Sequence, residues 1–310
     1  MHATLDDLVL ALYVTIDDLF RTHPEQLPAR PKIGFVPKIT DAELIPLAVM
    51  AALAGYTCER RWLRHAHQHL TSLFPYLPGQ SGYNRRLRKL APTMRWLIAT
   101  LGADTTIVDD DVWVVDSTPV ECARSRETVK RSDLAGFAEY GYCASHSRFF
   151  WGLRLHLVCT LHGLPVGWAL TGAKADERET LGAILAELPI VPGGAGRQML
   201  IADKNYFGRE FETALDHDGI DLLRPARKGE TPRAGAQFFK PLRQIVESVN
   251  QTLKGQLDLE RHGGRTPAGV CTRIAQRILA LTADLAQRPP RRHHPTLTDR
   301  LRPLTLESII

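Results

Sequence analysis

The sequence predicts an α/β protein in which a mixed β-sheet with flanking helices is preceded by an all-α N-terminal region. Apolar residues recur at helical spacing over residues 1–105. From residue 111 onward, short β-branched runs alternate with amphipathic stretches. A Pro/Arg-rich tail closes the chain. We therefore expect a helical region at 1–105, a mixed-sheet domain at 106–288 and a basic tail at 289–310.

The N-terminal region is predicted to form several helices. Apolar positions from Leu5 to Phe20 follow the helical period, and Thr40 with Glu43 makes a capping box before the next helix. Residues 59–70 and 82–100 are predicted as further helices. The last of these contains a cluster of basic residues, namely Arg85, Arg86 and Lys89. The cluster is either a solvated basic face or a surface that contacts DNA, and the sequence favours neither.

The second region begins with the run "VWVVD", a predicted strand that ends on Asp116. Later elements follow from changes of period and from turn residues. They are strands at 149–163 and 164–172, a helix at 176–188, a strand at 198–203, a helix at 208–219, a strand at 220–227 and a helix at 240–257. This order is that of the ribonuclease-H-like fold.

Two of the predicted strands end on an aspartate, Asp116 and Asp203. Sites in open α/β sheets gather at the carboxyl ends of strands, so neighbouring strands would bring these carboxylates together. The third acidic residue is Glu247 on the late helix, beside its buried apolar seam. The arc that contains Glu247 also holds Arg243, Asn250 and Lys254. Taken singly, an aspartate at a strand end is more often a turn residue or a helix cap.

An Asp-Asp-Glu set predicts a magnesium site. Mg²⁺ prefers a few carboxylates together with water and phosphate oxygens. Two Mg²⁺ ions about 3.5–4 Å apart, or Mn²⁺ in their place, can activate an attacking oxygen and stabilise the leaving one in phosphodiester transfer. Arg243 and Lys254 would hold nearby phosphates.

A second basic stretch follows the first predicted strand. Its cations are Arg124, Arg126, Lys130 and Arg131. They form either a loop that contacts phosphates or a plain solvated loop. Among the aromatic residues Phe149, Phe150 and Trp151, we expect at least two in the core, and the remaining ring could stack on a base.

Four segments, "VVDSTPV", "FFWGLRLHL", "LIADKNY" and "RQIVESVNQTLK", resemble the DDE transposases of bacterial insertion sequences, especially the family numbered 982. "SGYNRRL" is similar to a segment of that family's N-terminal region. The spacing of Arg243, Glu247 and Lys254 matches an R-x3-E-x6-K pattern of related transposases. The resemblance implies that Asp116, Asp203 and Glu247 bind the metal and that Lys254 contacts DNA near the cut.

Composition agrees with a DNA partner but does not prove one. The formal net charge is +5, which permits a polyanionic partner. The five scattered cysteines include no CxxC pair and favour a reducing compartment, and the acidic N-terminus is unlike a signal peptide. We expect a bacterial cytoplasmic, nucleoid-associated protein without a membrane span. By family analogy it acts as a homo-oligomer on double-stranded DNA, at both element ends and target.

The function expected from these residues is metal-dependent cleavage at element ends, followed by attack of a 3′-hydroxyl on target DNA. Two alternatives stay open. One is a nuclease of the same fold that hydrolyses DNA without strand transfer. The other is an inactive, DNA-binding relic of a transposase.

Overall fold

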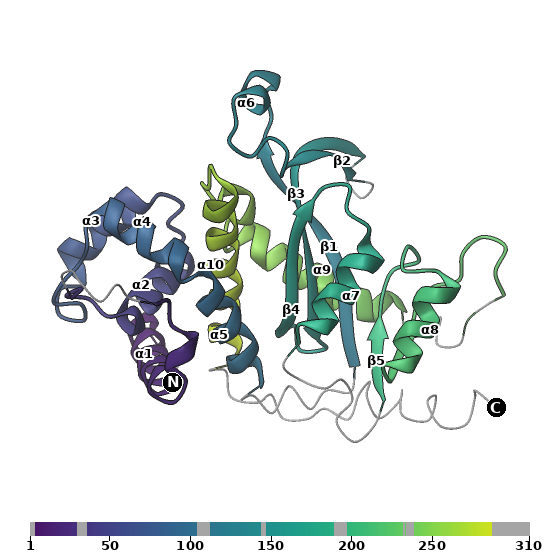
Figure 1. Cartoon of the computed structure of the whole chain (residues 1–310), viewed down its shortest axis with the longest axis horizontal. Coiled ribbons are helices and arrows are strands. Elements are labelled where there is room, and N and C mark those ends of the chain that lie inside the picture. Colours follow the sequence, from purple (N-terminus) through teal and green to yellow (C-terminus); the bar gives the residue numbers. More distant parts are fainter. Residues whose placement is uncertain are drawn as a thin grey trace. The chain divides into compact units, whose positions relative to one another are not determined.

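The computed structural model describes residues 4–29, 36–103, 112–143, 147–188, 197–231, 233 and 239–286, without the side chains of 239–243 (Figure 1). Two compact units divide these residues. The first contains the described residues of 1–101, 131–134 and 252–287, and the second those of 102–130 and 135–251. The predicted tail at 289–310 lies outside the described residues.

The first unit is built of helices. They are α1 (Leu5–Thr22), α2 (Asp41–Leu53), α3 (Glu59–His69), α4 (Gln80–Lys89), most of α5 (Ala91–Ala103) and α10 (Pro267–Ala286), with short 3₁₀ turns at Pro24–Gln26 and Leu259–Arg261. Helix α2 is buried over almost its whole length and packs against α1 and α10. The side-chain amide of Gln276 on α10 donates to the carbonyl of Ala48 on α2. The predicted capping box of Thr40 and Glu43 is confirmed.

The single helix predicted at 82–100 is wrong, because two helices occupy this stretch. Helix α4 ends at Lys89, and Leu90 forms a turn before α5 begins at Ala91. Pro92 is the second residue of α5, where its missing N–H costs nothing, whereas in the middle of one long helix it would break a hydrogen bond. The proline therefore marks a helix start that the apolar period alone does not reveal.

The second unit is built on a six-stranded mixed sheet. Its strands are β1 (Val112–Ala123), β2 (Glu139–Cys143), β3 (Arg148–Thr160), β4 (Pro165–Gly172), β5 (Gln198–Ile201) and β6 (Ile220–Leu223). The order is β2-β3-β1-β5-β6, and β4 also pairs with β3. β3 is antiparallel to β1, β2 and β4, whereas β5 is parallel to both β1 and β6. The predicted α/β class with a mixed sheet is confirmed.

Helices cover both faces of this sheet. They are α7 (Glu177–Ala186), α8 (Arg209–His217) and α9 (Phe239–Gly255), whereas the short helix α6 (Arg126–Lys130) has no buried residue. Alternate residues of β1 face opposite sides: Trp113 belongs to the core under α7 and α8, whereas Val114 belongs to the core that contains Val246 of α9. Successive strand residues therefore present their side chains to two different environments.

The first strand of the sheet does not end on Asp116, as the sequence predicted, but continues to Ala123. Pro119 lies within it, opposite Arg154 of β3. Proline is tolerated in a strand where its missing N–H has no ladder to join. β5 pairs only with Val112–Val114, so the other edge of β1 has no partner strand at Pro119 in the described part of the chain.

No helix in the described ranges combines the length and the apolar composition that crossing a membrane requires.

Candidate functional site

Asp116 lies within β1, and Asp203 comes shortly after the end of the neighbouring parallel strand β5. Val114 of β1 and Ile201 of β5 are directly paired. Each aspartate comes two residues after its member of this pair, and paired strands lie about 4.8 Å apart. The expectation that these two strands are neighbours is confirmed.

Burial and the negative charges at this end of the strands raise the pKa of one tyrosine, Tyr206. The Tyr206 hydroxyl is buried and has no hydrogen-bond partner among the described residues. Burial, and then the negative charges of Glu177, Asp116 and Asp203, raise its pKa well above the usual value. Both aspartates are therefore close enough to one hydroxyl to disfavour its ionisation.

The backbone after β5 fixes the position of Asp203. The Asn205 amide donates to the Asp203 carboxylate, and the Tyr206 amide donates to the Asp203 carbonyl at 3.2 Å. This turn directs the chain from β5 toward α8. An aspartate that initiates a turn is the ordinary structural role of such a residue, and the carboxylate keeps further lone pairs for other ligands.

Asp116 forms a hydrogen bond with a residue of helix α9. The Asn250 side-chain amide donates to Asp116 Oδ2 at 3.1 Å. Asp116 is half-buried and lies opposite Leu157 of β3. The aspartate thus shares the α9 face of the sheet with Val114, in agreement with the alternation along β1.

Glu247 is also on α9, one turn before Asn250, and its side chain is exposed. Across the described ranges, no three His, Cys, Asp or Glu side chains lie close enough together to hold a metal ion. Asp116, Asp203 and Glu247 therefore do not form such a group in this structure. Bringing Glu247 to the two aspartates requires a different side-chain rotamer or a movement of α9.

The two predicted cations of α9 are described to different extents. The side chain of Arg243 lies outside the described part of the chain. Lys254 is near the end of the helix, with its Nζ 3.9 Å from Glu260 Oε1. A pair at that distance is weak and can exchange for a phosphate.

A polar network on the opposite face of β1 was not predicted from the sequence. The Ser117 hydroxyl donates to Glu177 Oε1 at 2.6 Å, and Arg154 donates to both, at 3.0 Å and 3.1 Å. These bonds connect β1, β3 and the start of α7 directly beside Asp116. The available signal in the sequence was Ser117, a polar residue directly after Asp116. Because neighbouring strand residues face opposite sides of a sheet, Ser117 indicates a polar group on the face opposite to Asp116.

The donor set at the edge is suited to a hard divalent cation. Asp116 and Asp203 offer carboxylate oxygens, which are the hard ligands that Mg²⁺ prefers. Mg²⁺ is commonly held by one or two carboxylates with water and phosphate completing its shell. The two aspartates alone are therefore compatible with one Mg²⁺.

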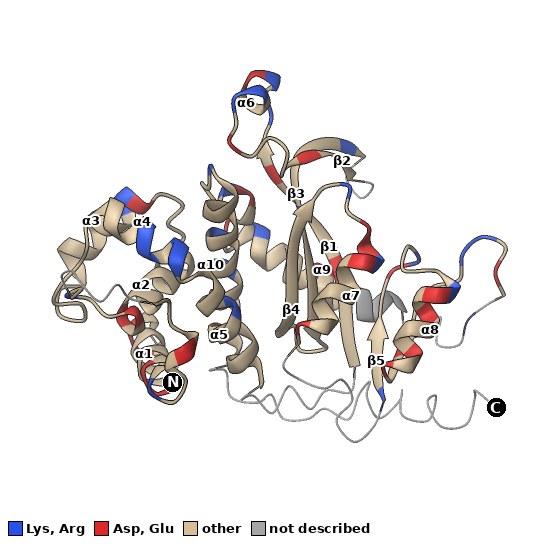
Figure 2. Cartoon of the chain, viewed as in Figure 1, with Lys and Arg blue, Asp and Glu red and all other residues tan. Residues whose placement is uncertain are grey.

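Basic residues colour much of α4 blue in Figure 2, and their contacts divide them into two kinds. Arg85 and Lys89 are exposed. Arg86 is partly buried, donates to the Ile39 carbonyl at 2.8 Å and pairs with Asp41. Arg85 and Lys89 are accessible to a phosphate, whereas Arg86 is already held by two groups of its own unit.

We expect Arg86→Ala to lower the free energy of unfolding by roughly 1–3 kcal/mol, because it leaves the Asp41 carboxylate without that partner. Lys89→Ala, on the same helix, should leave stability unchanged and reduce DNA affinity. Thermal denaturation and electrophoretic mobility shift of the two variants measure both effects. Equal stability of the two variants would contradict this assignment.

The basic stretch after β1 includes the short helix α6. Arg124 pairs with Glu121 at 3.0 Å and Lys130 pairs with Glu127 at 3.3 Å, whereas Arg126 and Arg131 are also exposed. The Lys130–Glu127 pair is exposed and contributes little to stability. Glu121 is largely buried, but the Arg124 side chain is itself exposed, so both cations stay accessible. The stretch is thus a short helix in part, where a loop was predicted, and its role in DNA contact stays a prediction.

The three aromatic residues at the start of β3 separate as predicted. Phe150 and Trp151 are buried. Phe149 is 79% exposed, and its ring lies 5.0 Å from that of Tyr142 on β2. The expectation that at least two of the three rings belong to the core is confirmed.

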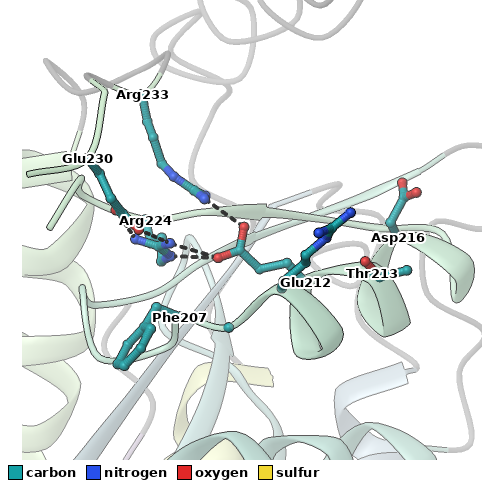
Figure 3. A pocket seen from close by; sticks show the side chains of 9 residues that line it. Phe207, Glu212, Thr213, Asp216, Arg224, Glu230 and Arg233 are labelled. Carbon is teal, nitrogen blue, oxygen red and sulfur yellow. Dashed lines mark hydrogen bonds and ion pairs between the residues drawn. The ribbon is translucent and has the colours of Figure 1, made fainter.

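A surface cleft of about 510 Å³ lies beside α8 (Figure 3). Arg224, only 2% exposed, pairs with Glu212 and Glu230 in its wall, and Arg233 also reaches Glu212. Figure 3 shows Arg224 between its two glutamates. Both partners belong to the same unit as Arg224, and the ion pairs therefore connect β6 and its following loop to α8.

Comparison with known proteins gives one match and one absence. A search of curated proteins finds no match. The family model of the transposase DDE domain matches residues 108–283, more than half of the chain. The match includes β1, β5 and α9, and so it includes the paired aspartates and Glu247. The chain therefore belongs to the transposase DDE domain family.

Proposed function

We propose that this chain is the DNA transposase of an insertion sequence. It cleaves double-stranded DNA at the element ends and then joins a 3′-hydroxyl to target DNA, and it works as a homo-oligomer. The observation that supports the proposal is the parallel pairing of β1 with β5, which puts Asp116 and Asp203 each two residues after the paired Val114 and Ile201, within the region that the family model matches. The mixed sheet is compatible with a ribonuclease-H-like fold, which we also propose.

In this proposal the site uses Asp116, Asp203 and Glu247 as metal ligands. Bound Mg²⁺, or Mn²⁺, would activate the attacking oxygen and stabilise the leaving oxygen of the phosphodiester. Asp116 comes from β1, Asp203 from the turn after β5, and Glu247 from α9. The exposed carboxylate of Glu247 would join the aspartates when DNA and two metal ions are present, because their positive charge offsets the repulsion among three carboxylates.

The proposed DNA contacts are basic side chains outside the carboxylate site. They are Arg85, Lys89, Arg124, Arg126, Lys130, Arg131, Arg243 and Lys254. Phosphate contacts supply affinity without sequence specificity and make it fall with salt. Arg86 was included in this group from the sequence, but its contacts with Ile39 and Asp41 support a structural role instead.

A second candidate, a DNA-binding protein without catalytic activity, is favoured by one observation. Glu247 is not grouped with the two aspartates. A relic could retain the basic surface and lose the ability to assemble three carboxylates. A nuclease without strand transfer would retain the carboxylates and differ only in the fate of the cut end.

A plasmid assay separates these functions. Supercoiled plasmid carrying the inverted repeats that flank the gene is incubated with protein and Mg²⁺ or Mn²⁺, and the products are resolved on a gel. We expect cleavage at the repeats and joined products that sequencing identifies as insertions. Cuts without joined products would favour the nuclease. Binding without cuts in either metal would contradict catalysis.

A further inference from the structure

Asn250 is a buried polar residue on the apolar side of α9. Its side chain is 8% exposed, and its neighbours along the same side include the buried Val246 and Leu253. The amide nitrogen donates to Asp116 Oδ2 at 3.1 Å. The amide oxygen is buried and has no hydrogen-bond partner among the described residues.

An asparagine in this position is costly for folding alone. Asparagine is a weaker helix former than leucine, by up to about 0.7 kcal/mol. A buried amide oxygen without a partner costs roughly a further 1–3 kcal/mol. A leucine has a similar branched shape and would avoid both costs, so the hydrogen bond to Asp116 is the contact that distinguishes asparagine from it.

The bond constrains the Asp116 carboxylate in a defined way. It engages Oδ2 and so limits rotation about the Cβ–Cγ bond. It also joins α9 to β1 one turn after Glu247. One side chain therefore links the orientation of Asp116 to the position of the helix that carries Glu247.

We propose that Asn250 is a positioning residue, which orients the Asp116 carboxylate for a divalent cation and holds α9 beside it. The proposal rests on the function proposed above, because it assumes that Asp116 binds metal. Partners that orient a metal-binding carboxylate change metal affinity by about 10–100-fold when they are removed. Asn250 does not touch the reacting atoms and acts through Asp116.

The test is the affinity of the full-length, DNA-free protein for Mn²⁺, measured by isothermal titration calorimetry. The variants are Asn250→Ala, which removes the amide, and Asn250→Leu, which removes the donor but retains the side-chain volume. Gln251→Ala is the matched control, because Gln251 is the next residue of α9 and is exposed. Thermal denaturation without metal shows whether each variant is folded.

We expect both Asn250 variants to raise the Kd for Mn²⁺ by about 10–100-fold, and Gln251→Ala to leave it unchanged. A folded Asn250→Leu protein with the wild-type Kd would overturn the positioning role. In that case loss of Mn²⁺ binding in Asp116→Asn would still support the proposed function. If the wild-type protein itself binds no Mn²⁺, both the proposed function and this inference fail.

Discussion

Replacing Asp116 or Asp203 with asparagine is expected to lower the rate of cleavage at the element ends by on the order of 10³ or more. Asparagine retains the shape of the side chain and removes the negative charge that Mg²⁺ requires. DNA affinity should not fall, because the proposed phosphate contacts are elsewhere and a negative charge has been removed. Cleavage of labelled end fragments and mobility shift of the same fragments measure the two effects.

The control is Asp216→Asn, which changes an exposed aspartate of α8 that pairs with Arg197. Cleavage by this variant should match the wild type. Near-normal cleavage by Asp116→Asn or Asp203→Asn would remove that residue from the metal site.

Glu247→Gln is the most informative variant of this series, because Glu247 is not grouped with the aspartates in this structure. We expect the same loss of cleavage, since the carboxylate must join the site when DNA and metal bind. If Glu247→Gln cleaves normally, the third ligand comes from elsewhere, or the two aspartates suffice.

Much of the second unit could be predicted because its signals are local. The apolar runs of β1, β3 and β5 and the positive-φ Gly219 after α8 follow from residues within each segment. Strand β2 could not be predicted in this way. Its five residues, Glu139–Cys143, include exposed Tyr140 and Tyr142, so the strand has no apolar run and forms only through its pairing with β3.

In the helical unit, contacts between helices that are far apart in the sequence could not be predicted either. Most of helix α10 lies within the match to the family model, yet the helix packs with α1, α2 and α4, which are more than 150 residues earlier in the chain. Its partner is set by tertiary contacts such as that of Gln276 with Ala48, which no local pattern encodes.

For the candidate site, the sequence predicted which acidic residues follow the strands and which residues share a face of the late helix. The pairing of β1 with β5 is as expected, and Asp116 and Asp203 each come two residues after the paired Val114 and Ile201. The contact of Asn250 with Asp116 was not predicted, although Asn250 fell in the same arc as Glu247. A helical arc gives an approximate direction, and the rotation of α9 against the sheet decides which of its polar residues reaches the carboxylate.

Arg224→Met is expected to lower the free energy of unfolding by roughly 2–3 kcal/mol. Removing one member of a buried ion pair typically costs about 3–5 kcal/mol, because the remaining charge is left without compensation. Here the partners Glu212 and Glu230 are 25% and 35% exposed, so water recovers part of that cost. Urea denaturation of the two proteins gives the difference directly. Arg209→Ala is the control, because Arg209 lines the same cleft and is exposed.

The same cluster predicts how this difference depends on pH. A hydrogen bond from Arg224, followed by one from the Arg227 amide, lowers the pKa of Glu230 to about 2. Burial alone would raise the Glu212 pKa, but hydrogen bonds from Arg233 and Arg224 outweigh it and lower that pKa. Both glutamates therefore stabilise the fold above their unfolded pKa, about 4.3, and lose that contribution as the pH falls through their folded values. The stability difference between wild type and Arg224→Met should be full at pH 7 and shrink between about pH 4.3 and pH 2. A difference that stays constant over this range would show that Arg224 stabilises the unit by packing and not by charge.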